Sequence, residues 1–182
     1  APWRFGWNNY TNLNTDNTGT WTTLPNGDRI WHVVLHCENA LTINLTFNHT
    51  VIPAGNELYV FNPEKELILG NFTANHLYEG ELGTELVPGS TSIVEYFVPK
   101  NNAQGHVQIG VVTHGYRTAV EFQEKAFGSS GSCNRNVNCS EGLPWTQQRN
   151  GAVMLVSGSS GFCSGSLINN TLNDGKPYVL TA

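Results

Sequence analysis

Apolar and polar positions alternate along most of the chain between residues 27 and 117. A period of two is the side-chain period of a β-strand. Strands are therefore predicted at 29–37, 40–47, 56–62, 67–73, 91–99 and 105–117. In the first run Ile30, His32, Val34 and His36 share one face, and Trp31, Val33, Leu35 and Cys37 share the other. In the second run Leu41, Ile43, Leu45 and Phe47 point one way, while Thr42, Asn44 and Thr46 are expected to point out.

Turn-forming residues separate these runs, at 53–55, 62–63, 88–89 and 101–102. Glycine, proline and asparagine dominate them, as is usual for tight turns. None of the runs shows the spacing of an amphipathic helix. Short strands at this spacing predict an all-β fold, in which residues 1–127 form an antiparallel β-sandwich or jelly-roll-like domain.

The alternation ends after residue 122, and the Gly/Ser-rich run EKAFGSSGSCNRNVNC (124–139) follows. Polar, glycine-rich sequence of this kind is typical of exposed links that proteases cut. Beyond it, GAVMLV (151–156), SGFCSGSLINNT (160–171) and KPYVLTA (176–182) are predicted to be strands. Residues 128–182 have too little apolar surface to close a core alone, so we expect an incomplete second domain.

Composition fits a globular, exported protein. The 182 residues are 39% hydrophobic and only 13% charged, with a net charge of −5, and this acidic balance disfavours a nucleic-acid partner. No run is long and apolar enough for a membrane span. Asn-x-Ser/Thr sequons and crowded cysteines point to export, and we expect secretion, with Ala1 near a mature N-terminus. The sequons begin at Asn9, Asn44, Asn48, Asn71, Asn138 and Asn169.

Two groups of side chains raise other functions. His32 and His36 share a strand face, and His76, His106 and His114 add possible ligands, but we expect local hydrogen bonds instead of a metal site. Aromatic residues crowd the first part of the chain, where they could form a platform for sugar rings; core packing is the favoured interpretation. These residues are Trp3, Phe5, Trp7, Tyr10, Trp21 and Trp31. Cys37 is expected to be a buried free thiol. No nucleophile–base pair can be identified within 1–127.

Three segments carry a family resemblance. GSSGSCNRNVNCSEG (128–142), GAVMLV (151–156) and CSGSLINNTLNDGKPYVLTA (163–182) together resemble the start of mature lysyl endopeptidase. That enzyme is a bacterial secreted, trypsin-like serine endopeptidase with a chymotrypsin-like double β-barrel. The resemblance implies that 128–182 is the incomplete start of such a domain, and that 1–127 is a prodomain-like N-terminal domain.

The resemblance also implies where catalysis would come from. In trypsin-like proteases a strand ending in Leu-Thr-Ala runs into a His-Cys pair whose histidine is the base, so that histidine is expected about two residues after Ala182. No Ser-His-Asp triad is expected in the chain, and the chain alone is expected to be inactive. In the family the equivalents of Cys133, Cys139 and Cys163 form disulfides with later cysteines, which places all three partners beyond the chain end. A local Cys133–Cys139 bond remains an alternative.

The processing region departs from the family pattern. The resembled enzyme begins at a glycine matching Gly128 and is released by cleavage after lysine, but Phe127 precedes Gly128 here and the nearest basic residue is Lys125. Cleavage after lysine is therefore only one possible specificity of the full-length enzyme. The expected partners are protein or peptide substrates of the full-length enzyme and an intramolecular prodomain–protease contact, with no cofactor. The alternatives are a glycan- or surface-binding β-sandwich module and an inactive protease homologue.

Overall fold

The computed structural model describes residues 3–117 and 139–181. The chain divides into two compact units, one of them Gly6–Thr118 and the other containing, among the described residues, 3–5 and 139–181. Strands dominate both units, and all strand pairs between described residues are antiparallel. The all-β prediction is therefore confirmed. The predicted boundary between residues 127 and 128 lies outside the described residues.

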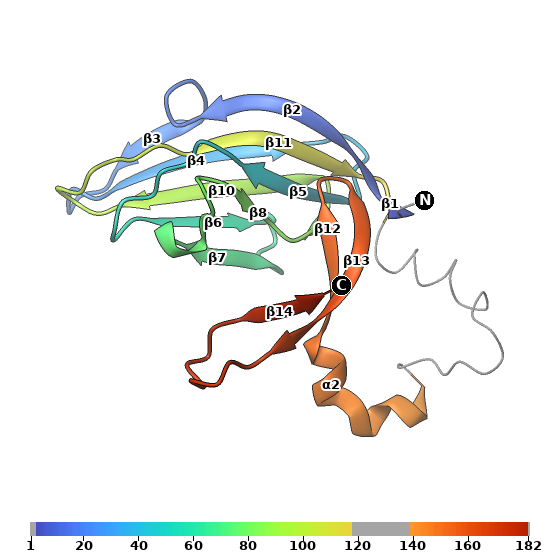
Figure 1. Ribbon diagram of the computed structural model, residues 1–182. Coiled ribbons are helices and arrows are strands. Elements are labelled where there is room, and N and C mark those ends of the chain that lie inside the picture. Colours follow the sequence, from blue (N-terminus) through green and yellow to red (C-terminus); the bar gives the residue numbers. More distant parts are fainter. Residues whose placement is uncertain (1–2, 118–138, 182) are drawn as a thin grey trace. The chain divides into compact units, whose positions relative to one another are not determined.

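Two sheets build the unit 6–118 (Figure 1). The first sheet has the order β3-β4-β10-β6-β7, and the second has β2-β11-β5-β8, with β9 also paired to β5. The strands are β2 (Gly6–Asn14), β3 (Thr20–Thr23), β4 (Arg29–His36), β5 (Thr42–Phe47), β6 (Glu57–Phe61), β7 (Ile68–Phe72), β8 (Leu82–Gly83), β9 (Val87–Pro88), β10 (Thr91–Val98) and β11 (Gln108–Gly115). A short 3₁₀ helix, η1 (Ala74–His76), follows β7.

A single apolar layer joins the two sheets into a sandwich. Buried side chains of β4, β6 and β10 belong to the same hydrophobic cluster as those of β5 and β11. Along β4 the residues Trp31, Val33 and Leu35 are buried while His32, Val34 and His36 are exposed, as the alternation predicted. Burial in β10 alternates in the same way over its whole length. In each of these strands, the alternation of apolar and polar residues therefore identifies the side that faces the core.

A β-bulge at Gly110 interrupts the alternation in β11. The register with both β2 and β5 shifts between Ile109 and Val111, so Ile109 and Val112 both reach the core although they lie three residues apart. A side chain at Gly110 would collide with Asn48, because a Cβ there would lie 2.3 Å from the Asn48 amide nitrogen. Glycine allows this close approach at a bulge.

Three features of this unit differ from the sequence-based expectation. Strands β2, β3, β8 and β9 were not predicted; β2 is an asparagine-rich edge strand without a regular apolar period, and β8 and β9 have two residues each. Thr42 and Asn44 are on the predicted outer side of β5 but are only 6% and 5% exposed, since β5 lies between β11 and β8. Leu41, predicted to point with the core residues, precedes β5 and is 41% exposed.

The second unit contains a four-stranded sheet and a short helical segment. Strand β13 pairs with β12, with β14 and, at its start, with β1. The elements are β1 (Trp3–Arg4), η2 (Ser140–Trp145), α2 (Thr146–Gly151), β12 (Ala152–Ser157), β13 (Ser160–Ile168) and β14 (Tyr178–Thr181). The strands at 151–156, 160–171 and 176–182 were predicted, whereas η2 and α2 were not. No helix of the described ranges has the length and apolar character of a membrane span.

Gly165 lets β13 and β14 approach each other. It is paired with Thr181, and a Cβ at this position would lie 2.7 Å from Cγ1 of Val179 and 2.9 Å from the carbonyl oxygen of Leu180. Contacts this short force the strands apart, because the nearest atoms include backbone. The glycine of the Cys-Ser-Gly-Ser-Leu-Ile run therefore has a steric role.

A buried polar network fixes the loop before β6. Asn56 is fully buried, and its amide nitrogen donates to the Tyr96 hydroxyl at 2.7 Å and to the carbonyl oxygen of Ala103 at 2.9 Å. Its amide oxygen accepts a hydrogen bond from Asn102 at 2.6 Å. The Tyr96 hydroxyl in turn donates to the carbonyl oxygen of Gln104 at 2.6 Å. Burial raises the pKa of Tyr96, so the phenol stays a neutral donor.

Replacing Asn56 with alanine tests this network. We expect Asn56→Ala to lower the free energy of unfolding by about 2 kcal/mol, because Tyr96 and Asn102 lose partners inside the protein. Urea denaturation followed by tryptophan fluorescence would measure the change. The control is Asn9→Ala on the exposed face of β2, which should change stability by less than about 0.5 kcal/mol. Equal midpoints for the two variants would contradict this role of Asn56.

Replacing Gly165 with alanine tests the β13–β14 contact. We expect Gly165→Ala to accelerate hydrogen exchange of the paired β14 amides about tenfold, because overpacking costs about 1–3 kcal/mol. The matched control is Gly151→Ala, since a Cβ at Gly151 meets no atom within 4 Å. Unchanged exchange in β14 of the Gly165 variant would show that the strands tolerate the added methyl group.

Candidate functional site

The motif that carried the family resemblance lies on two adjacent strands. The Cys-Ser-Gly-Ser-Leu-Ile run occupies β13, and Tyr178–Thr181 forms β14, paired to it from Gly165–Thr181 to Ile168–Tyr178. A hollow of about 520 Å³ lies over this pair. Its lining residues are Ser164, Gly165, Ser166, Leu180 and Thr181. The lining combines three hydroxyl-bearing residues with a glycine and the apolar Leu180.

Cys163 lies beside the end of β14. Its sulfur is 3.3 Å from Oγ1 of Thr181 and donates weakly to the carbonyl oxygen of Ser164 at 3.5 Å. Thr181 also donates to that carbonyl oxygen at 2.9 Å. The Cys163 thiol therefore lies beside the end of β14. In the resembled family, the Leu-Thr-Ala sequence at this point leads into the catalytic histidine. Its disulfide with a later cysteine stays a prediction.

The other predicted cysteines are placed differently. Cys139 is an exposed free thiol at the start of η2, and Cys133 lies outside the described residues. Cys37, predicted to be buried, is a half-buried free thiol packed against the sandwich core, and burial raises its pKa. The processing region of Lys125, Phe127 and Gly128 also lies outside the described residues.

A hydrogen-bonded turn connects β13 to β14. The Asp174 carboxylate accepts from the backbone nitrogen of Lys176 at 3.1 Å and from Asn170 at 2.7 Å, and it pairs with the Lys176 ammonium at 3.3 Å. The hydrogen bond from the Lys176 backbone is the main cause that lowers the pKa of Asp174, with Asn170 next. The turn orders the connection although its side chains are exposed.

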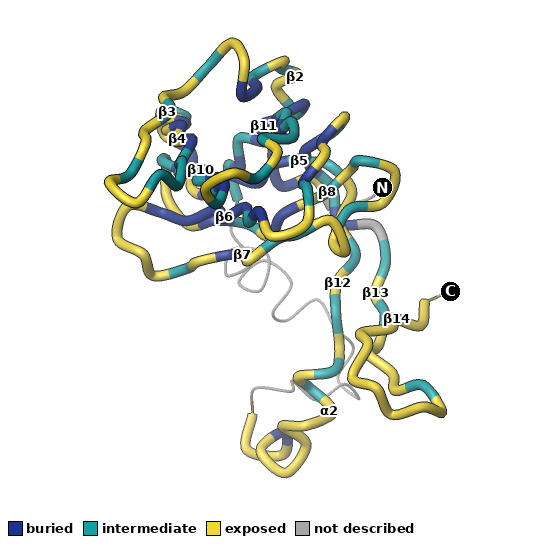
Figure 2. The backbone as a smooth tube through the Cα atoms, turned by 90° about the vertical axis from the view of Figure 1, so that its left-hand side faces the viewer, coloured by how far each residue is buried: buried dark blue, intermediate teal, exposed yellow. Residues whose placement is uncertain are grey.

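Among the described side chains of 139–181 none that is apolar is buried, whereas Phe5 of the same unit is fully buried. Figure 2 shows β12, β14, α2 and the later part of β13 as exposed or intermediate, whereas the sandwich strands contain many buried residues. The large apolar side chains with exposed fractions above 40% are Leu143, Trp145, Met154, Val156, Leu167, Ile168, Leu172, Tyr178, Val179 and Leu180. The strands among these residues are joined by antiparallel pairing along β13.

The histidines all belong to the sandwich unit. Two contact hydroxyl groups: His36 lies 3.0 Å from Oγ1 of Thr91, and His76 lies 3.2 Å from Oγ1 of Thr73. His106 instead pairs with Asp16 at 3.2 Å. In the described ranges no histidine contacts both a hydroxyl and a carboxylate, and no cluster of His, Cys, Asp and Glu is suited to a metal ion.

The aromatic residues of the first part of the chain do not form one platform. Trp31 is fully buried in the sandwich core and Trp21 packs against that core, so core packing is confirmed for these two; Phe5 is fully buried but is not part of this core cluster. Trp7 and Tyr10 are instead 56% and 82% exposed. Trp7 has a ring contact with Tyr116, their centroids 5.5 Å apart.

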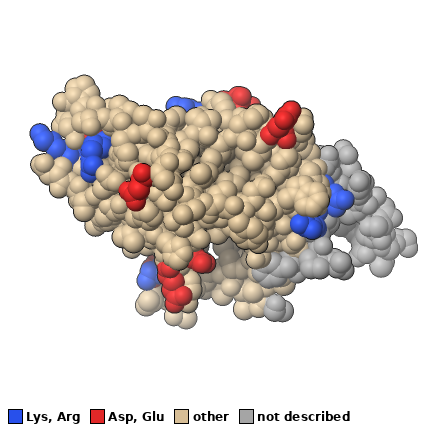
Figure 3. All heavy atoms as spheres, turned by 90° about the horizontal axis from the view of Figure 1, so that it is seen from above, with Lys and Arg blue, Asp and Glu red and all other residues tan. Residues whose placement is uncertain are grey.

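Charged side chains do not mark a site by themselves. Figure 3 shows Lys and Arg scattered among Asp and Glu on the visible face, without a large patch of one sign.

Sequence reasoning missed a hollow lined by Tyr59, Phe61, Lys65, Ile68 and Glu95. The alternation at 56–62 places Tyr59 and Phe61 on one face, but only strand register brings Glu95 opposite Tyr59, and only a turn brings Lys65 over the Phe61 ring.

Comparison with known families bears on the second unit. Residues 127–182 match the family model described as lysyl endopeptidase, C-terminal domain. The match covers less than a third of the 182 residues. No solved structure matches the chain. The C-terminal segment is therefore related to the lysyl endopeptidases, and through them to proteases.

Proposed function

We propose that residues 128–182 form the start of the catalytic domain of a secreted, trypsin-like serine endopeptidase, and that residues 1–127 form a prodomain-like N-terminal domain of the same precursor. The observation that carries this proposal is the match of 127–182 to the lysyl endopeptidase family model. The all-β character of both units is compatible with it.

Peptide hydrolysis by such an enzyme needs three groups that act together. Serine attacks the scissile carbonyl, histidine transfers the proton, and aspartate orients the imidazole and stabilises its charged form. Residues 128–182 contain no histidine. On this proposal the triad therefore comes from downstream sequence of the parent protein, with the base directly following the Leu-Thr-Ala sequence.

The contacts of Cys163 support this arrangement. Its sulfur lies 3.3 Å from the Thr181 hydroxyl at the end of β14. The family pattern pairs this cysteine with the one that follows the catalytic histidine. A disulfide from β13 to the chain after β14 would hold the base near a paired strand, and disulfides of this kind persist in secreted proteins.

The N-terminal domain then acts on the protease from within the same chain. The proposed partners of the parent enzyme are peptide or protein substrates. Within the same chain, the N-terminal domain contacts the catalytic domain, either while that domain folds or while it is latent. Lysine specificity depends on pocket residues outside the 182 residues, and Phe127 before Gly128 departs from the family cleavage pattern.

Esterase and amidase assays test the assignment of catalysis. The 182-residue chain should not hydrolyse lysyl, arginyl or phenylalanyl peptide esters, whereas the parent protein extended through its downstream sequence should. Activity of the extended protein should disappear on treatment with a serine-directed inhibitor. An extended protein that folds and binds substrate but never turns it over would instead identify an inactive homologue. Inhibitor-sensitive turnover by the 182-residue chain would contradict the assignment.

Limited proteolysis tests the division into two domains. The polar, glycine-rich sequence at 122–132 predicts that the first cut of the chain occurs there. Mass spectrometry of the early fragments would locate it. As a control, the hairpin turn at 62–65 should be cut later, because Asn62 hydrogen-bonds across it. A first cut between residues 30 and 117 would argue against the division.

A further inference from the structure

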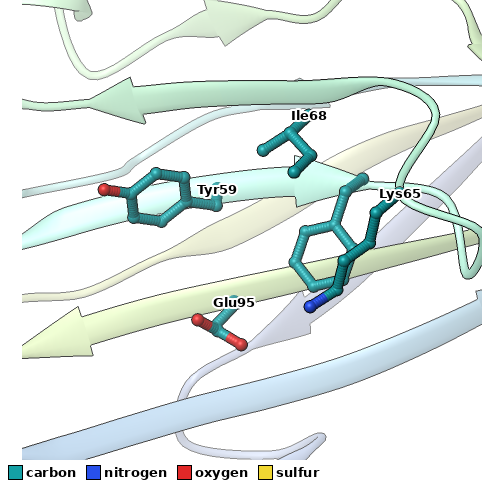
Figure 4. Close-up of a pocket in the computed structure, with 5 residues that line it drawn as sticks. Tyr59, Lys65, Ile68 and Glu95 are labelled. Atoms are coloured by element: carbon teal, nitrogen blue, oxygen red, sulfur yellow. The ribbon is translucent and has the colours of Figure 1, made fainter.

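The first sheet carries a hollow of about 230 Å³ on its outer face. The residues that line it alternate with core residues: Leu58, Val60, Val94 and Tyr96 point into the sandwich, whereas Tyr59 and Glu95 lie between them on the opposite side. Strand pairing places Glu95 across from Tyr59 and Phe61 across from Ile68. Figure 4 shows Tyr59, Lys65, Ile68 and Glu95 around one space.

A turn fixes the position of Lys65 at this hollow. The backbone nitrogen of Lys65 donates to the carbonyl oxygen of Asn62 at 2.9 Å, and the buried Asn62 side chain accepts from the backbone of Leu67 at 3.3 Å. Lys65 has a φ of 55°, a left-handed conformation that costs a residue other than glycine about 1 kcal/mol. The Lys65 ammonium lies 5.6 Å from the centre of the Phe61 ring, a favourable cation–π distance.

The polar groups of the hollow keep unused hydrogen-bonding capacity. Within 3–117 and 139–181, neither the Lys65 ammonium nor the Glu95 carboxylate forms an ion pair. The Tyr59 hydroxyl donates to Glu57 at 2.5 Å, and Glu57 also accepts from Asn71 at 3.0 Å. The hydrogen bond to Glu57 is the main cause that raises the pKa of Tyr59 to about 12. The phenol oxygen therefore stays protonated, and its lone pairs can accept a hydrogen bond.

This combination selects a class of ligand. The Tyr59 ring and the exposed Ile68 side chain offer apolar contact, while the Lys65 ammonium donates and the Glu95 carboxylate and the Tyr59 oxygen accept. A simple anion would be repelled by Glu95 and a simple cation by Lys65. A neutral ring with C–H groups on its faces and hydroxyl groups around its edge satisfies every group at once.

We propose that the hollow formed by Tyr59, Phe61, Lys65, Ile68 and Glu95 binds one pyranose ring of a glycan. The sugar ring packs against Tyr59 and Ile68, its hydroxyl groups donate to Glu95, and one accepts from Lys65. This activity is separate from the proposed protease function, because every residue of the site belongs to the sandwich unit.

The test uses the full 182-residue chain and two-dimensional amide NMR. The probes are methyl glucopyranoside, methyl galactopyranoside, methyl mannopyranoside and N,N′-diacetylchitobiose, with glycylglycine as a zwitterionic comparison. We expect at least one sugar to shift the signals of Tyr59, Ile68 and Glu95 saturably. Glu95→Ala should weaken this binding about tenfold or more, because a hydrogen bond to a charged group is lost.

A second variant separates binding from folding. Lys65→Gly removes the ammonium and suits the left-handed backbone, so stability should be kept while sugar binding weakens about tenfold. The matched control is Asn101→Gly, which replaces an exposed residue with a φ of 65° and should leave binding unchanged. The proposal is overturned if no sugar shifts these signals, if only glycylglycine does, or if Lys65→Gly and Glu95→Ala bind as tightly as the parent chain.

Discussion

The sandwich depends on burying large aromatic rings together with their polar atoms. Trp31 is fully buried, and its indole nitrogen donates to the carbonyl oxygen of Thr18 at 2.7 Å. A Cβ at Gly19 would lie 2.6 Å from that nitrogen, so glycine is required beside the ring. The Trp21 indole donates to Thr15 in the same loop at 3.0 Å. A buried N–H without a partner costs about 1–3 kcal/mol. The burial of these rings in the core therefore depends on the conformation of the loop that accepts their hydrogen bonds.

The second unit is organised on a different physical basis. Its strands are paired along β13, but no described apolar side chain of 139–181 is buried. Strand pairing alone stabilises a sheet weakly, since most of the stability of a sheet comes from packing one face. Residues such as Leu167, Ile168, Val179 and Leu180 are therefore suited to packing against further protein surface.

Local patterns in the sequence predicted most of the strands that contribute to the sandwich core. They identified β4, β5, β6, β10 and β11, where apolar residues recur at a period of two, and also β7, whose apolar residues do not alternate. They failed for β2 because its position at a sheet edge leaves polar residues on both sides. The hollow at Lys65 depends on register between distant strands and on the turn at Asn62, which no local period encodes. The family resemblance identified the protease-like motif in the C-terminal segment. Peptide hydrolysis by a serine protease, however, requires catalytic side chains that this segment does not include.

The position of Asn44 restricts how the protein can be produced. Asn44 begins an Asn-Leu-Thr sequon in the middle of β5 and is only 5% exposed. Thr113, across the strand pair, is fully buried. An oligosaccharide attached there during synthesis would be too large for this position and would prevent the sheet from closing. A eukaryotic secretory host that modifies Asn44 would therefore yield misfolded molecules, whereas a host without N-linked glycosylation avoids this route.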